Sequence, residues 1–185
     1  MRLTALLLLL VGHVPAMAQP DLLAAPRPLV LVETVALPLS MAQVEQAARQ
    51  AWAWSFGLEP GATIIQAGEN GRIEGTARFN FRASGVGNRL QTLGVINYHV
   101  TIQAANGQCR VRLSQFTHTG NRNAPGGAIN LGIIYEGERP DARIPQISRG
   151  TAQRLHDDMR TQASTHLRSV IGTFASRLRT AAQDR

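Results

Sequence analysis

The sequence predicts an α+β domain in the order strand, helix, four strands, helix, with an antiparallel sheet and helices packed on one face of it. Three observations support this class. Segments with one apolar and one polar face recur between residues 62 and 116, which is typical of a sheet covered on one side only. A helix-start motif stands at residues 39–44, and apolar residues follow helical spacing from Thr151 to Ala182.

The first two elements are a strand and a helix. Residues 29–36 (LVLVETVA) are dense in aliphatic and β-branched side chains, so we expect a buried strand. Ser40 and Gln43 form a capping box, which predicts a helix from about Met41 to Phe56 with a left-handed stop at Gly57.

Two tryptophans of this helix must have different surroundings. Trp52 lies on the apolar face and Trp54 does not, because two residues are about 200° apart around a helix. We expect Trp54 to lie under a neighbouring segment, and the alternative is an exposed aromatic contact.

Two hairpins should follow. Residues 62–67 and 72–82 are joined by a turn, and residues 97–116 fold back at Asn106-Gly107, for which we expect a type I′ turn. That turn fixes a register in which apolar residues face apolar partners and Arg110 and Arg112 face the polar side. The loop at 83–92 lacks the third glycine of a nucleotide-binding loop, and we expect a strand rather than a helix after it.

The last third holds a connection and a helix. Residues 119–148 are rich in Gly, Pro and Asn around one apolar stretch at 129–135, which predicts a short helix or an irregular pass over the domain. The apolar face of the closing helix is needed to cover the sheet, and this outweighs an alternative in which its arginines bind a membrane surface.

The N-terminal residues predict where the protein is located. Residues 1–18 have the pattern of a secretory signal peptide with cleavage near Ala18, and residues 19–28 form an extended leader to a single domain at 29–182. We therefore expect a secreted or periplasmic protein with no transmembrane segment. Cys109 is the only cysteine, so we expect no lipid anchor. Its alternation with apolar neighbours favours a core position over a reactive or intermolecular thiol.

Charge and catalytic motifs exclude several functions. All 19 basic residues are arginine and the net charge is +7, which gives only weak support for an anionic partner, and we expect no nucleic acid. No His pair has metal-ligand spacing and no serine has a nucleophile-elbow context, so we predict no metal, no cofactor and no enzymatic activity. A hydrolase remains the less favoured alternative and would need an acidic or His-lined cleft near His99 or His118.

Short structural motifs carry a family resemblance. The strand and capped helix ending near Trp52, the turn and strand GRIEGT at residues 71–76, and YHVTI followed by NGQCRV between residues 98 and 111 resemble a bacterial family of unknown function. That family has a TATA-binding-protein-like fold, and the resemblance implies this fold and a secreted or envelope location. It supplies no catalytic residue, and the fold name does not imply DNA binding. The glycine-rich residues 125–132 depart from the family pattern.

Two functional hypotheses follow. The first is a non-enzymatic envelope or secreted domain that binds an anionic envelope polymer or lipid headgroup, or serves as a scaffold, through the polar sheet face. Its candidate contacts are Arg78, Arg82, Arg110 and Arg112. The alternative is a structural or protein-partner module that uses Trp54 and the glycine-rich segment.

Overall fold

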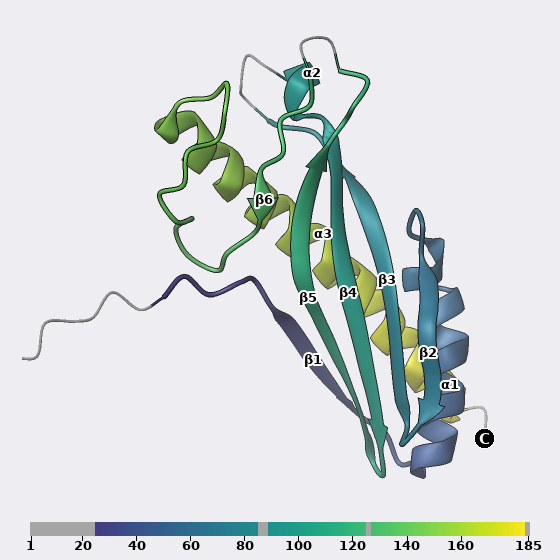
Figure 1. Cartoon of the computed structure of the whole chain (residues 1–185). Helices are drawn as coiled ribbons and strands as arrows, with labels where there is room; N and C mark the ends of the chain where they lie inside the picture. Colours follow the sequence, from purple (N-terminus) through teal and green to yellow (C-terminus); the bar gives the residue numbers. More distant parts are fainter. Residues whose placement is uncertain (1–24, 85–88, 125–126, 184–185) are drawn as a thin grey trace, which may run out of the picture.

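The computed structural model describes residues 25–84, 89–124 and 127–183 (Figure 1). Its elements in chain order are β1 (Leu31–Ala36), α1 (Met41–Ala53), the 3-10 helix η1 (Phe56–Leu58), β2 (Thr63–Glu69), β3 (Arg72–Phe81), α2 (Arg89–Thr92), β4 (Gly94–Ala105), β5 (Gln108–Gly120), β6 (Gly132–Ile133) and α3 (Arg149–Gln183). The predicted signal peptide, most of the predicted leader, and the loop glycines Gly85 and Gly87 lie outside the described residues.

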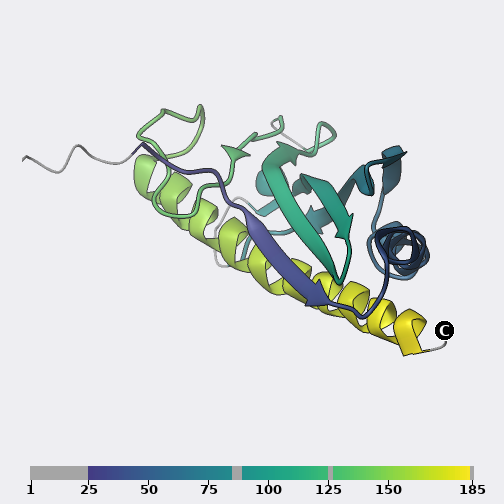
Figure 2. The ribbon, with the colours of Figure 1, turned by 90° about the horizontal axis from the view of Figure 1, so that it is seen from below.

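One antiparallel sheet organises the molecule. Its strands lie in the order β1-β5-β4-β3-β2, and β6 pairs with β5 beyond the end of β1. Both long helices lie on the same side: Figure 2 shows α1 almost end-on and α3 running across the picture beneath the strands. In the described part of the chain no further layer covers the other face. The sequence-predicted α+β arrangement, a sheet with helices packed on one face, is confirmed.

The start of α1 follows its capping box. The backbone amide of Ser40 donates to Oε1 of Gln43 at 3.0 Å, as the motif predicts. The amide of Met41 donates to Oδ1 of Asn106 at 2.8 Å, so the turn between β4 and β5 satisfies a second free donor of the helix. The helix start is therefore fixed both locally and by the sheet.

The end of α1 differs from the prediction. The helix stops at Ala53 instead of Phe56, and the chain continues into η1. The Ser55 hydroxyl donates to the carbonyl oxygen of Ala51 at 2.7 Å, which competes with helical hydrogen bonding at this turn. The predicted left-handed stop at Gly57 is wrong, because Gly57 lies inside η1 and its φ is not positive.

The β4–β5 hairpin has the predicted register. Ala104 faces Cys109 and Thr101 faces Arg112 across the two strands. The predicted type I′ turn is wrong, because only Gly107 of the turn has a positive φ, at 80°. A type I′ turn needs positive φ at both central residues.

A bulge interrupts β5. The register shifts opposite the segment from Asn97 to His99, where Gln115 has a φ of 58°. The extra residue changes which positions face the helices, so Phe116 is buried although it is three residues from buried Leu113. Strict alternation along β5 therefore ends at the bulge.

A single apolar core lies between the sheet and the two helices. Trp52 of α1 packs on Phe56 of η1 with ring centroids 5.4 Å apart, and Phe56 packs on Phe174 of α3 at 5.5 Å. Leu155, Met159 and other residues at three- and four-residue spacing bury one side of α3. The closing helix covers the sheet, as its pattern predicts.

Three smaller expectations need correction. β1 is an edge strand whose side chains are mostly exposed, so the predicted buried strand at 29–36 is wrong. Its aliphatic composition suits an edge beside one neighbour as well as a buried position. The short helix α2 precedes β4, where we expected a strand directly after the loop. β5 continues to Gly120, so the connection begins at residue 121.

The connection is tied down by two buried histidines. We call residues 129–136 the strap; within it Ile129, Leu131 and Ile134 are buried, and β6 pairs with β5. The amide of Leu131 donates to Nδ1 of His118 at 3.3 Å, and the amide of Tyr135 donates to Nε2 of His156 at 2.9 Å. The segment is thus an irregular pass that closes the core, one of the two predicted forms.

Candidate functional site

The uncovered face of the sheet is mainly polar, and we call it the open face. It presents alternate residues of the strands: Val32 and Thr34 of β1; Glu74, Thr76, Arg78 and Asn80 of β3; Val95, Asn97, His99, Thr101 and Gln103 of β4; Arg110 and Arg112 of β5. The aromatic residues of these strands, Phe79, Phe81, Tyr98 and Phe116, are buried on the helix side. Base stacking on the open face therefore has no aromatic platform among the described residues.

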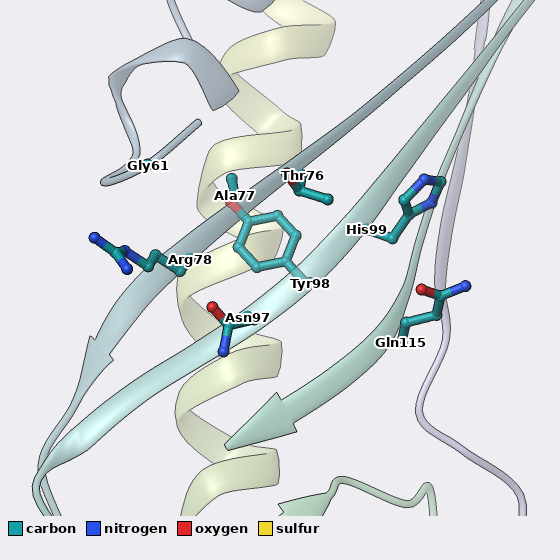
Figure 3. A pocket seen from close by; sticks show the side chains of 8 residues that line it. All are labelled: Gly61, Thr76, Ala77, Arg78, Asn97, Tyr98, His99 and Gln115. Atoms are coloured by element: carbon teal, nitrogen blue, oxygen red, sulfur yellow. The ribbon is translucent and has the colours of Figure 1, made fainter. Parts of the chain in front are cut away.

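A hollow of about 410 Å³ lies at the centre of the open face (Figure 3). Thr76 and Arg78 enter it from β3, Asn97 and His99 from β4, and Gln115 from the bulge of β5. Ala77 and Tyr98 line it through their backbone, since their side chains are buried. The lining combines one guanidinium with hydroxyl, amide and imidazole groups, which donate and accept hydrogen bonds.

Two further hollows continue the central one along the strands. At the end near the Asn106-Gly107 turn, a hollow of about 350 Å³ is lined by Gln66, Asn70, Arg72, Glu74 and Gln103. At the other end, one of about 500 Å³ is lined mainly by the ends of β3, β4 and β5 and includes Arg82. Arg72 and Arg82 are ten positions apart along β3 and the residue that follows it, so the three hollows extend over about 30 Å.

The four predicted arginine contacts share the open face but do not form one cluster. Arg78 and Arg82 line the central and far hollows. Arg110 and Arg112 lie on β5, opposite Gln103 and Thr101 of β4. Arg78 lies opposite Asn97, at least four residues further along β4. The two pairs of arginines are therefore more than about 13 Å apart along the strands. Among the described residues, none of the four has a carboxylate within ion-pair distance. Arg72, by contrast, is paired with Glu74.

His99 has an acidic neighbour that the sequence did not reveal. Its Nε2 lies 3.8 Å from Oε2 of Glu74 on the adjacent strand, and its Nδ1 is 3.4 Å from the Thr101 hydroxyl. Ser114 is its register partner but is buried. The ring nitrogens thus face Glu74 and Thr101, so the arrangement does not align His99 with Ser114 as base and nucleophile.

Trp54 and the glycine-rich segment lie in different places. Trp54 is 59% exposed, so the predicted cover by a neighbouring segment is wrong and its alternative, an exposed aromatic residue, holds. The Arg177 guanidinium of α3 lies 5.5 Å from the centre of the ring. The strap meets α3 near His156 and Arg160, about 25 Å along the helix from Arg177. The two parts of the alternative interface are therefore not brought together.

The described residues offer no reactive thiol, metal cluster or membrane-spanning helix. Cys109 is buried, and burial raises the pKa of its thiol to about 12, as suits a core residue. Within the described ranges, no group of three or more His, Cys, Asp or Glu side chains is placed to hold a metal ion. No helix among those described is long and apolar enough to cross a membrane.

Sequence reasoning missed the central hollow. The alternation of polar and apolar residues predicted a polar, solvent-exposed face of the sheet. Alternation shows on which face a side chain lies, but not where that face is hollow. Gln115 enters through a bulge, which has no signal in the alternation of the strand. Glu74 could have been placed beside His99 once β3 and β4 were taken as neighbours.

Comparison with known proteins supports the fold. Neither a protein-family model nor a curated protein sequence matches the chain. Among solved structures, a TBP-like protein from Parabacteroides distasonis is similar with a TM-score of 0.54 and 9% identity, over 80% of this chain and 92% of that one. A DUF4468 family protein from Bacteroides ovatus gives a TM-score of 0.47 and 18% identity, over 80% and 86%. The predicted likeness to bacterial domains of unknown function with a TATA-binding-protein-like fold is confirmed at the level of the fold.

Proposed function

We propose that this chain is a non-enzymatic secreted or envelope domain that binds an extended anionic polymer along its open face. The observation that carries the proposal is the line of three hollows over about 30 Å of β3 and β4. A site of this length and shallow form suits a linear chain better than a small compact ligand, for which enclosed apolar pockets are usual.

The chemistry of the hollows favours an acidic polysaccharide. The side chains of Thr76, Asn97 and Gln115 can donate to and accept from sugar hydroxyls. Arginines bind carboxylate, sulfate or phosphate groups in bidentate geometry, and Arg78 and Arg82 stand in successive hollows. Arg110 and Arg112 add positive charge beside the same face. A signal-peptide pattern at residues 1–18 is consistent with a polymer of the cell envelope.

Direct binding to defined polymers tests the proposal. Polygalacturonate serves as the acidic probe and dextran as the neutral one, with calorimetry at several salt concentrations. Arg110→Ser with Arg112→Ser, and separately Arg78→Ser, should weaken polygalacturonate binding. Two exposed ion contacts of about 0.3–1 kcal/mol each predict a loss of about 3- to 30-fold for the double variant, and binding should weaken with salt.

The matched control is the pair Arg143→Ser and Arg154→Ser, which removes the same charge from exposed positions that line none of the three hollows; Arg154 lies on α3, on the helix side of the sheet. Affinity should change little in this control. Equal losses in both double variants would show a net-charge effect without a site. Absence of polygalacturonate binding, or equal binding of dextran, would contradict the proposal. Binding only to vesicles with anionic lipid would assign the charge to headgroups instead.

A further inference from the structure

The two edge strands of the sheet differ in how well they resist the addition of another strand. β2, one edge, carries two register irregularities against β3, and such bulges hinder the addition of another strand. β1, the other edge, pairs with β5 over six consecutive residues without a shift. It contains no proline or lysine, and its only charged residue is Glu33. β1 is therefore an unblocked edge.

The backbone of β1 has a defined outward side. At its two ends, the amide of Leu29 donates inward to Ile134 at 2.8 Å, and the amide of Leu37 donates inward to Gly107 at 2.9 Å. Hydrogen-bonding direction alternates along a regular strand, so the odd-numbered residues point inward. Val32 and Thr34 then direct their amides and carbonyls away from the sheet, where a partner strand would meet them.

A groove with an excess of positive charge runs beside this edge, because its two arginines outnumber its one carboxylate, Glu33. A hollow of about 540 Å³ separates β1 from α3, and its lining includes Leu31, Glu33, Arg168, Ile171 and Arg179. Among the described residues, neither Arg168 nor Arg179 has a carboxylate within ion-pair distance. The two arginines are three turns apart on α3, which is about 16 Å along the helix, and Ile171 lies between them in the sequence. Figure 2 shows β1 lying alongside this part of α3.

We propose that β1 binds an extended acidic peptide segment of a partner protein as an added edge strand, with carboxylates placed on Arg168 and Arg179. The outward groups of Val32 and Thr34 supply backbone hydrogen bonds, which is the mode of β-strand addition. Side chains on one face of the added strand enter the groove, so a central apolar residue meets Ile171. Two acidic residues four positions apart span about 13 Å, within reach of two flexible arginines.

Charge selects this occupant over a second copy of the chain. Pairing of two β1 edges would bring two basic grooves together in a protein whose net charge is +7. Like charges facing each other oppose association. An acidic segment instead neutralises both arginines. This site lies on the edge and the helix side of β1, so it does not depend on the polymer site of the open face.

The test uses the full chain and a fluorescent peptide with the order Thr-Glu-Thr-Ile-Thr-Glu-Thr, read by anisotropy. The control peptide carries Lys in place of both Glu residues. Thr34→Pro removes an outward amide and blocks strand addition, while proline is tolerated at an edge position whose amide faces solvent; Thr34→Val is its matched control. Circular dichroism checks that each variant folds, and a peptide methylated on its backbone nitrogens blocks the same hydrogen bonds without changing the protein.

We expect binding of the Glu peptide, at least tenfold weaker binding in the Arg168→Ser, Arg179→Ser variant, and loss of binding with Thr34→Pro or with the methylated peptide. Equal affinity for the Lys peptide would overturn the role of charge. Binding that survives both backbone changes would overturn strand addition. Self-association in sedimentation that Thr34→Pro abolishes, without peptide binding, would assign the edge to a second copy and refute the proposal.

Discussion

Acidification should destabilise this protein through His118. The imidazole is buried, and its Nδ1 accepts a hydrogen bond from the amide of Leu131 in the strap. Burial lowers the pKa of His118 to about 4, although a backbone hydrogen bond at Thr92 acts in the opposite direction. A proton on Nδ1 would also place two N–H donors against each other. Protonation therefore opposes both the burial of the ring and the attachment of the strap.

The sign and size of the effect follow from linkage. Because the folded-state pKa of about 4 lies below the ordinary value of 6.5, the unfolded chain binds more protons between these two values. The stability that His118 contributes is therefore complete above pH 6.5 and is lost as the pH falls toward 4. At pH 4.5 the loss from this residue alone is about 2.5 kcal/mol. Burial lowers the pKa of His156 too, so it acts in the same direction.

Urea unfolding at pH 7.5 and pH 4.5 measures this contribution when the protein is compared with His118→Asn. The Asn oxygen can still accept from Leu131, but the side chain does not titrate. The difference in free energy of unfolding between the two pH values should be about 2.5 kcal/mol larger for the unchanged protein. Carboxylates and His156 titrate in both proteins, so their effects cancel. Equal pH dependence of the two proteins would refute the role given to His118.

Three more predictions concern the core. Trp52→Ala should lower the free energy of unfolding by about 3–5 kcal/mol. Trp54→Ala loses only an exposed contact with Arg177 and should lower it by less than about 1 kcal/mol. Urea titration of the two variants measures both values. Gly75→Ala should destabilise by more than about 2 kcal/mol, because a Cβ there meets the Trp52 ring and lies 2.6 Å from the Thr63 carbonyl oxygen. Gly172→Ala, in open space on α3, should instead stabilise by up to about 1 kcal/mol. Cys109 should react with a thiol reagent at pH 8 only after unfolding, since its pKa is raised to about 12; fast labelling of the folded protein would contradict this.

Much of the fold could be predicted because local and long-range signals agree. The capping box fixed the start of α1, and alternation on both sides of Asn106-Gly107 fixed the register of β4 and β5. In each case two independent patterns gave the same answer, which is typical of a sequence that specifies one structure. The spacing of apolar residues in α3 likewise indicated its length and its buried side.

The remaining features depend on contacts between distant segments. Asn106 was expected to serve a type I′ turn, but its side chain caps α1, 65 residues away in the sequence. The open face was identified, whereas its hollows depend on a bulge at Gln115 and on the loop near Gly61. The exposure of β1 depends on which strand lies at the edge, and strand order is not encoded in the composition of a single strand.

An added strand should affect polymer binding only when it carries charge on the open face. Arg112 of β5 lies beside Val32 of β1, and a strand added to β1 would lie two strand spacings from β5, about 10 Å. Its side chains on the open face would therefore stand near Arg112. A bound peptide with Thr at those positions should leave the affinity for polygalacturonate unchanged. A peptide with Glu at those positions should weaken polygalacturonate binding at low salt. The effect should be smaller at 0.15 M salt, where the screening length is about 8 Å. Calorimetry of polygalacturonate binding with each peptide bound measures this coupling, and equal affinities at low salt would separate the two surfaces completely.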